Sequence, residues 1–155
     1  MNPKIATLPA GLYLVSTPIG NSRDITLRAL DTFASADFLA AEDTRTLRKL
    51  LEIHGIDVRS RQIISYHDHS GEAIRSKIID EISEGRSVAY GSEAGTPLVA
   101  DPGYKLAKDV IEAGQMVYAI PGASAVLSAL AVSGLPSDRF TFAGCDKTRL
   151  SPTAY

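Results

Sequence analysis

The sequence predicts an α/β fold in which one domain is built on a parallel sheet of strand–helix repeats. Five short runs of β-type residues recur along the chain, and each precedes a loop and a helical pattern. The runs do not alternate between apolar and polar residues, which is typical of strands covered on both faces. The 155 residues are 45% hydrophobic and 22% charged, which suits one globular core. The expected strands are residues 12–15, 37–41, 62–66, 87–90 and 116–120.

The expected helices have recognisable ends. Residues 44–54 carry leucines at helical spacing, and the pattern stops at Gly55. In the next helix Ser70 is the expected N-cap, and Gly85 stands where a left-handed C-terminal residue belongs. Residues 124–133 are rich in alanine, whose small side chain would let this helix pack closely against the sheet. The apolar residues that mark one face of the two earlier helices are Leu47, Leu50, Leu51, Ile74, Ile78, Ile79 and Ile82.

Composition limits the possible classes of function. The single cysteine, Cys145, excludes an internal disulfide and a cysteine-based zinc site, which fits a reducing cytoplasm. No apolar run reaches the length of a membrane span, so we expect a cytoplasmic protein without membrane contact. The net charge of −2 argues against strong nucleic-acid binding by the whole chain. Residues 45–61 nevertheless hold five basic and two acidic residues, a local charge of +3.

Three loops rich in glycine and proline are the main candidates for a ligand site. They span residues 17–21, 92–103 and 121–125, and each directly follows an expected strand. Because ligands of parallel sheets bind beyond the carboxyl ends of the strands, these loops should converge on one site. Their sequences match neither the phosphate loop of nucleoside triphosphatases nor the dinucleotide-binding fingerprint. Each loop alone is equally compatible with an ordinary tight connection, and only their convergence favours a binding site.

A polar run, Glu42-Asp43-Thr44-Arg45, joins the second expected strand to the following helix. Asp is among the favoured helix N-caps, and the helix dipole stabilises a carboxylate there by about 0.3–1 kcal/mol. The two adjacent carboxylates would also suit orientation of a polar substrate or abstraction of a proton. Capping is the preferred explanation of Asp43, and the catalytic explanation stays open beside it.

Two histidines, His67 and His69, flank Asp68 and would point the same way on an extended segment. A third ligand of the usual kind is not apparent, since the remaining candidates are His54 and Cys145. We therefore expect no metal site. The histidines are interpreted as loop residues that hydrogen-bond to a substrate or to a neighbouring chain.

The three loops belong to a series of seven motifs whose order and spacing resemble the tetrapyrrole methylase superfamily. They are more closely similar to its branch of ribosomal RNA small subunit methyltransferase I. The resemblance covers residues 12 to about 144. The matching stretches are residues 12–21, 24–30, 41–45 with 48–51, 65–69, 91–103, 121–125, and 133–136 followed by Phe140 and Phe142.

This resemblance implies an activity, a cofactor and partners. Members of the branch transfer a methyl group from S-adenosylmethionine to the ribose 2′-hydroxyl of a cytidine in small-subunit rRNA. They act as homodimers on the 30S particle, and each subunit has two α/β domains with the cofactor between them. By matching motif, the residues that would line the cofactor are Pro18, Gly20, Ser92, Glu93, Ala94, Gly95, Thr96, Pro97, Gly122, Ala123, Ser124 and Ala125.

The resemblance also suggests which residues would act on the substrate. A base that takes the hydroxyl proton would contribute about 10²–10⁴-fold to the rate. The candidates for this base are, in order, Asp43, Glu42 and Glu93. An ordinary solvated side chain is the alternative explanation for every arginine considered. The candidates for substrate contacts are Arg23, Arg28, Arg45, Arg48, His67 and His69.

Two features depart from the family pattern. Glu93 stands where the family usually has Asp, so its carboxylate reaches one methylene further. Residues 145–155 resemble nothing in the family, which continues after this point through a basic linker into a second domain. We therefore expect residues 1–144 to form the N-terminal domain of the tetrapyrrole methylase fold, with a tail at 145–155 and the second domain absent. The activity of this chain is then expected to be incomplete.

Two other functions stay open. A tetrapyrrole C-methyltransferase of the corrin or sirohaem pathways shares the architecture, although residues 42–45 and 66–69 favour the RNA branch. A non-catalytic domain that only binds a nucleoside or another protein chain belongs to a different class, and the expected truncation makes it plausible.

Overall fold

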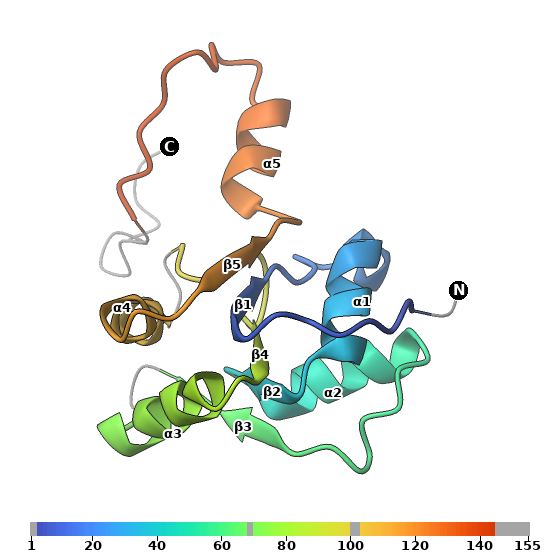
Figure 1. Ribbon diagram of the computed structural model, residues 1–155. Coiled ribbons are helices and arrows are strands. Elements are labelled where there is room, and N and C mark those ends of the chain that lie inside the picture. The colour runs from blue at the N-terminus through green and yellow to red at the C-terminus, as the bar shows by residue number, and fades with distance from the viewer. Residues whose placement is uncertain (1–2, 68–69, 100–102, 145–155) are drawn as a thin grey trace.

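Strands and helices alternate along the chain (Figure 1) in the computed structural model, which describes residues 3–67, 70–99 and 103–144. Each strand boundary lies within one residue of its predicted position, so the prediction of five strand–helix repeats is confirmed. The strands are β1 (Gly11–Val15), β2 (Phe38–Ala41), β3 (Ile63–Ser65), β4 (Ser87–Gly91) and β5 (Val117–Ile120). The helices are η1 (Ser22–Asp24, a short 3-10 turn), α1 (Leu27–Ser35), α2 (Thr44–Ile53), α3 (Glu72–Ser83), α4 (Tyr104–Glu112) and α5 (Ala125–Val132).

The five strands form one parallel sheet in the order β3-β2-β4-β1-β5. From β1 the chain crosses to β2 and β3 on one side, and from β4 it crosses past β1 to β5 on the other. The strands β1 and β4 are neighbours in the sheet. The connection that follows β1 and the connection that follows β4 therefore run in opposite directions across the sheet. Ligands of open α/β sheets bind beyond the carboxyl ends of such a pair. The topology thus selects the end of the β1–β4 pair as the candidate site.

Helices cover both faces of the sheet, as the apolar strands predicted. On one face α1 and α2 bury Phe33 and Leu51 against the strands, and on the other α3 and α4 bury Ile78 and Leu106. Figure 1 shows the two helix pairs on opposite sides of the strands. A fully buried side chain of this size stabilises the fold by about 1.5–3 kcal/mol, so these two layers hold the sheet in place. None of the helices within the described ranges is long and apolar enough to cross a membrane.

The last helix departs from this arrangement. No residue of α5 is buried, and Figure 1 shows it standing beyond the edge strand β5 rather than over a face of the sheet. The prediction that this alanine-rich helix packs against the sheet is wrong. Small side chains permit close packing, but the connection after β5 leads the chain past the edge of the sheet. Leu127 and Val132 are consequently 58% and 85% exposed.

The helix ends follow the predictions with one exception. Asp43 is the N-cap of α2, as its residue type indicated. Gly55 and Gly85 follow their helices in the left-handed region, with φ of +74° and +91°. The assignment of Ser70 as an N-cap is wrong, because α3 begins after Gly71, which makes no side-chain capping bond. The Ser70 hydroxyl instead accepts a hydrogen bond from the backbone N–H of His67 at 2.8 Å.

Candidate ligand site at the carboxyl edge of the sheet

The glycine- and proline-rich segments that follow β1, β4 and β5 meet at one edge of the sheet. We call residues 16–21, 92–97 and 121–124 the rim loops. The first two pair as a short antiparallel bridge, in which Thr17 and Gly95 exchange N–H···O bonds of 2.9 and 3.1 Å. The predicted convergence of the loops is confirmed, and it occurs at the end of the β1–β4 pair.

Hydroxyl groups tie the three rim loops together. The Ser16 hydroxyl donates to the Thr96 hydroxyl at 3.3 Å, and Thr96 donates to the carbonyl of Ala123 at 3.1 Å. The Thr17 hydroxyl donates to the carbonyl of Ser92 at 3.2 Å, and the Ser92 hydroxyl donates to that of Gly95 at 2.9 Å. Each loop is thereby fixed by at least one other, which gives a site whose backbone is held before a ligand arrives.

Two glycines allow the rim loops to approach so closely. A Cβ atom on Gly122 would lie 2.9 Å from the Cβ of Ser16, which is too close for two carbon atoms. Gly95 has φ of +82°, in the region that favours glycine, and a Cβ there would lie 3.3 Å from Ile19. Side chains at these positions would therefore push the rim loops apart.

The chain beyond the second rim loop carries an unusual backbone conformation. Leu98 is the one residue other than glycine with positive φ in the described part of the chain, at +72°. Its side chain leaves no space for a Cβ on Gly103, which would lie 2.7 Å from Leu98 Cδ2. Conformations of this kind cost about 1–3 kcal/mol and occur where the surrounding structure enforces them.

The predicted cofactor-binding residues fall into three groups by exposure. Five of these twelve residues are exposed, and the other seven are partly or fully buried. The exposed residues are Gly20, Glu93, Ala94, Gly122 and Ala125. The partly buried residues are Pro18, Thr96, Ala123 and Ser124. The buried residues are Ser92, Gly95 and Pro97.

The three candidate carboxylates lie in different environments. Asp43 Oδ1 accepts hydrogen bonds from the backbone N–H groups of Arg45 and Thr46, at 2.8 and 3.4 Å. The bond from Arg45 is the main cause that lowers the Asp43 pKa below its ordinary value. Glu42 Oε2 accepts from the backbone N–H of Glu93 at 3.4 Å, which links the end of β2 to the second rim loop. Glu93 itself is exposed.

A cavity of about 170 Å³ lies between the first rim loop and α2. Thr17, Pro18 and Gly20 line it from the loop, and Glu93 lines it from the second rim loop. Thr46 and Lys49, which α2 contributes, were missing from the sequence-based candidates. Their spacing of three residues, which puts both on one helix face, was the signal that could have identified them.

Two of the four candidate arginines hold the fold together. Arg28 donates to the carbonyl of Ala119 at 2.9 Å, which ties α1 to β5. Arg48 donates to the carbonyls of Val58 and Arg61, at 2.8 and 3.4 Å. The side chain of Arg45 is 91% exposed and lies 3.5 Å from Asp43. Arg23 is exposed. Arg23 and Arg45 are therefore better placed than the other two to contact a substrate.

One of the two histidine candidates lies within the described residues. His67 is exposed and its backbone N–H donates to Ser70, while His69 lies outside the described residues. Across residues 3–67, 70–99 and 103–144 no group of three or more His, Cys, Asp or Glu side chains is arranged to hold a metal ion.

Comparison with known proteins connects this geometry to a family. The sequence pattern of the family described as Tetrapyrrole (Corrin/Porphyrin) Methylases matches residues 11–146. A ribosomal RNA small subunit methyltransferase I of Mesorhizobium japonicum is 54% identical over 137 residues, which are 88% of this chain and 46% of the relative. A protein of the same name from Bacillus subtilis is 44% identical over 133 residues, 86% of this chain and 44% of the relative. The chain spans about half the length of the curated relatives it matches.

Solved structures agree with the fold. The uroporphyrin-III-C-methyltransferase from Thermus thermophilus is similar with a TM-score of 0.58 and 26% identity, over 82% of this chain and 53% of that one. A cobalt precorrin-4 methyltransferase is similar with a TM-score of 0.61 over 77% of this chain and 48% of that one. At 18% identity the second likeness concerns the fold alone. The predicted fold class is confirmed.

Proposed function

The chain belongs to the tetrapyrrole (corrin/porphyrin) methylase family, and from this premise we propose that its rim loops bind S-adenosylmethionine. We further propose that the methyl group is delivered to the ribose 2′-hydroxyl of a cytidine in small-subunit rRNA. The observation that carries the proposal is the interlocking of three rim loops at the end of the β1–β4 pair. The names of the relatives support rRNA as the substrate class.

The exposed surface of the rim loops fits the proposed cofactor. Gly20 has no neighbouring atom within 4 Å of where a Cβ would lie, and Ala94 and Gly122 are exposed, so a methionine carboxylate can approach peptide N–H groups. The Glu93 carboxylate is exposed at the same edge and suits the positive sulfonium. S-adenosylmethionine, when bound, supplies a methyl carbon activated by its bond to sulfur. The buried Ser92 and the hydroxyl chain through Thr96 fix the loops rather than contact the ligand.

The three candidate carboxylates differ in their suitability as the base that accepts the hydroxyl proton. Asp43 caps α2 and has a lowered pKa, which makes it a weaker proton acceptor than an ordinary aspartate. Glu93 lines the cavity beside α2, and Glu42 holds its backbone in place. We assign proton acceptance from the ribose hydroxyl to Glu93, with Glu42 and Asp43 as positioning residues. A base placed in this way contributes about 10²–10⁴-fold.

Two measurements test the proposal. Isothermal titration of the 155-residue chain should detect S-adenosylmethionine binding, with weak affinity, because the rim loops form only part of the cofactor site that the family builds between two domains. Methyl transfer should be measured with labelled S-adenosylmethionine and unmodified small ribosomal subunits, using the chain supplied with the remaining half of a relative. We expect label in the rRNA, and none when Glu93→Gln is used at the same concentration.

The alternatives have their own outcomes. The likeness to a uroporphyrin-III-C-methyltransferase favours a tetrapyrrole substrate as the second candidate. Label in uroporphyrinogen and none in the ribosomal subunits would establish that candidate. Label in neither, with the chain folded and the cofactor bound, would establish a non-catalytic binding domain.

A homodimer is proposed from the family resemblance, as is a cytoplasmic location. The structure offers a surface for self-association at α5, whose Leu127 and Val132 are exposed. Apolar side chains gathered on an uncovered helix are typical of interaction surfaces.

A further inference from the structure

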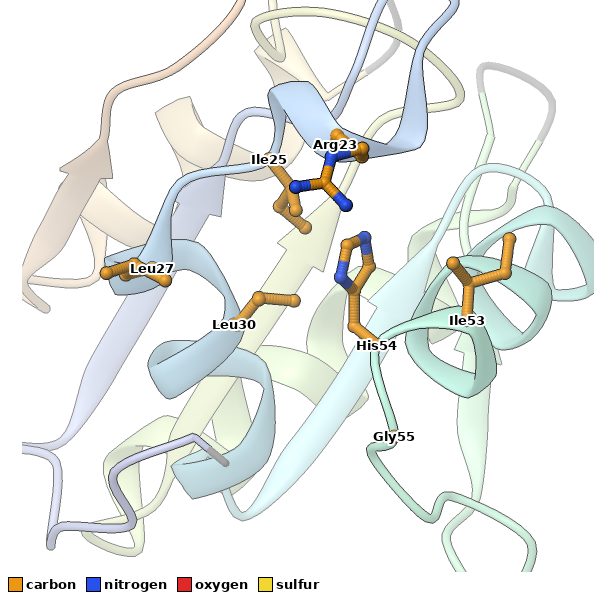
Figure 2. A pocket seen from close by; sticks show the side chains of 7 residues that line it. All are labelled: Arg23, Ile25, Leu27, Leu30, Ile53, His54 and Gly55. Carbon is orange, nitrogen blue, oxygen red and sulfur yellow. The ribbon is translucent and has the colours of Figure 1, made fainter. Parts of the chain in front are cut away.

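A second cavity lies next to the rim loops, between η1, the start of α1 and the end of α2 (Figure 2). Its volume is about 510 Å³, within the range of pockets that hold small ligands. We call it the flanking pocket, and its principal lining residues are Arg23, Ile25, Leu27, Leu30, Ile53 and His54. No role proposed above uses this cavity.

One wall of the flanking pocket is polar. His54 Nε2 lies 2.8 Å from the carbonyl oxygen of Ser22, and because a carbonyl only accepts, Nε2 carries the proton. This bond fixes the imidazole ring between α2 and η1. Figure 2 shows the Arg23 guanidinium pointing toward the ring across the hollow. No described residue forms a hydrogen bond with that guanidinium or with His54 Nδ1, so both can meet a ligand.

Apolar side chains lie on either side of this polar pair, with Ile25, Leu27 and Leu30 on one side and Ile53 on the other (Figure 2). Leu30 and Ile25 are buried, at 8% and 9% exposure, whereas Leu27 and Ile53 are 58% and 57% exposed. The pocket thus combines a guanidinium with apolar side chains, which are two kinds of group that recognise a nucleotide. The guanidinium binds phosphate oxygens in a bidentate manner, and apolar side chains cover a base.

The flanking pocket continues from the smaller cavity of the rim loops. Ile53 lines both cavities, and Ser22 of the smaller one is adjacent to Arg23 of the larger one. Lys49 lies in the smaller cavity, one helical turn before Ile53. A polynucleotide strand that reaches Glu93 would therefore find a cation at Lys49 and a second one at Arg23.

We propose that the flanking pocket binds a nucleotide adjacent to the methylated one in single-stranded RNA. Arg23 pairs with its phosphate, His54 Nδ1 accepts from a hydroxyl, and Leu27 covers its base. This inference rests on the proposed function for the RNA substrate, and it adds the site that holds the strand in register. RNA is recognised in this way through unstacked bases and 2′-hydroxyl contacts.

The test is fluorescence anisotropy of the 155-residue chain with a labelled single-stranded RNA of about 12 nucleotides. Arg23→Gln should weaken binding about tenfold and reduce the slope of log K against log salt by about 1. Leu27→Ser should weaken binding about threefold with an unchanged salt slope, because it removes apolar cover alone.

Arg59→Gln is the matched control. Arg59 is exposed, lies beyond α2 and pairs with Asp57 at 2.7 Å, so its loss changes the net charge equally without touching the flanking pocket. We expect less than a twofold effect. An equal loss for Arg23→Gln and Arg59→Gln would show general electrostatic attraction and overturn the flanking pocket as a site.

The other outcomes separate this inference from the proposed function. RNA binding by the wild type that Arg23→Gln leaves unchanged overturns the flanking pocket alone. No RNA binding by the folded wild-type chain overturns the flanking pocket, while methyl transfer to small ribosomal subunits remains the separate test of the proposed RNA substrate. If Arg23→Gln keeps its affinity for the oligonucleotide but loses affinity for 30S particles, the pocket binds a ribosomal protein and the RNA assignment is wrong.

Discussion

At Gly122 the first and third rim loops lie so close together that there is no space for a side chain. A Cβ atom would meet Ser16 Cβ at 2.9 Å, and overpacking of this kind costs about 1–3 kcal/mol. The contact matters for function because the ligand-facing backbone on both sides of it belongs to the proposed cofactor site. Any displacement here moves two rim loops at once.

Gly122→Val should therefore abolish detectable S-adenosylmethionine binding in isothermal titration, because it separates the rim loops while leaving the two core layers intact. Gly71→Ala is the control, since a Cβ at Gly71 has no neighbour within 4 Å. This control should bind as the wild type does. Wild-type affinity in Gly122→Val would contradict the proposed location of the cofactor.

The carboxylate of Asp37 links two strands at their amino ends, which lie opposite the rim loops. Its Oδ2 accepts from the backbone N–H and the hydroxyl of Ser87, at 2.8 and 2.7 Å. These two bonds lower the Asp37 pKa below its ordinary value, and the bond from the backbone N–H of Ser87 makes the largest contribution. The starts of β2 and β4 are joined in this way. The stabilisation requires the ionised carboxylate.

The lowered pKa of Asp37 determines how its contribution to stability depends on pH. Because the folded pKa is lower than the unfolded one, the contribution is fully present above the unfolded value, about 3.9. It is lost as the pH falls through the folded pKa. Asp37→Asn should lower the urea midpoint at pH 6, and its difference from the wild type should shrink toward pH 2. The exposed Asp80→Asn is the control, and a constant difference for Asp37→Asn across that range would refute the assignment.

At the scale of elements, arginine side chains tie helices to neighbouring loops and strands. Arg61 donates to the carbonyls of Phe33, at 2.7 Å, and of Ala36, which are left without helical partners at the end of α1. Its burial lowers the pKa of the guanidinium, the expected effect of removing a cation from water. The basic character of residues 45–61 thus reflects in part the construction of the fold.

Arg61→Ala should lower the free energy of unfolding by about 1–3 kcal/mol, because two carbonyls at the end of α1 lose a charged donor. Arg61→Lys should recover less than half of this, since an ammonium cannot reproduce the planar fork of the guanidinium. Urea denaturation checks both, with Arg59→Ala as the exposed control. A loss for Arg59→Ala as large as that for Arg61→Ala would contradict the explanation.

At the scale of the whole molecule, helices cover both faces of the sheet over its inner strands, while β5 is partly exposed and α5 is uncovered. Its apolar residues continue into the exposed Leu135, Phe140 and Phe142 of the following segment. In Figure 1, α5 lies beyond β5, away from both helix layers. An apolar surface of this kind is the natural place for the proposed contact between two copies of the chain.

We expect the wild type to dimerise in sedimentation experiments, and Leu127→Lys combined with Val132→Lys to leave the chain monomeric over the same range of concentrations. Charges introduced at the centre of an apolar contact prevent its desolvation. Ile111→Lys on α4, where Ile111 is 61% exposed, is the control and should dimerise normally. Unchanged dimerisation of the double variant would exclude α5 from the interface.

Much of the fold could be predicted because its signals are local. The apolar runs gave each strand within one residue, and Asp43, Gly55 and Gly85 marked helix ends through their own conformational preferences. Ser70 failed as a cap because its hydroxyl bonds instead to a backbone group on the preceding loop. The residue type shows which capping bonds a side chain is able to form. Contacts with the neighbouring loop determine whether those bonds form in the folded chain.

The sequence by itself determined that three glycine- and proline-bearing loops share one edge, because parallel strands all end on the same side. Only the tertiary structure decided which residues of those loops are exposed to a ligand. It also decided that Arg28 hydrogen-bonds to the backbone of β5 while Arg23 lines a cavity. The same holds for α5, whose composition suits burial but whose position beyond β5 leaves it exposed. Periodicity and capping act between close neighbours in the chain. Burial and pairing depend on residues far apart, such as Arg28 and Ala119 or Ser22 and His54, and appear only once the chain is folded.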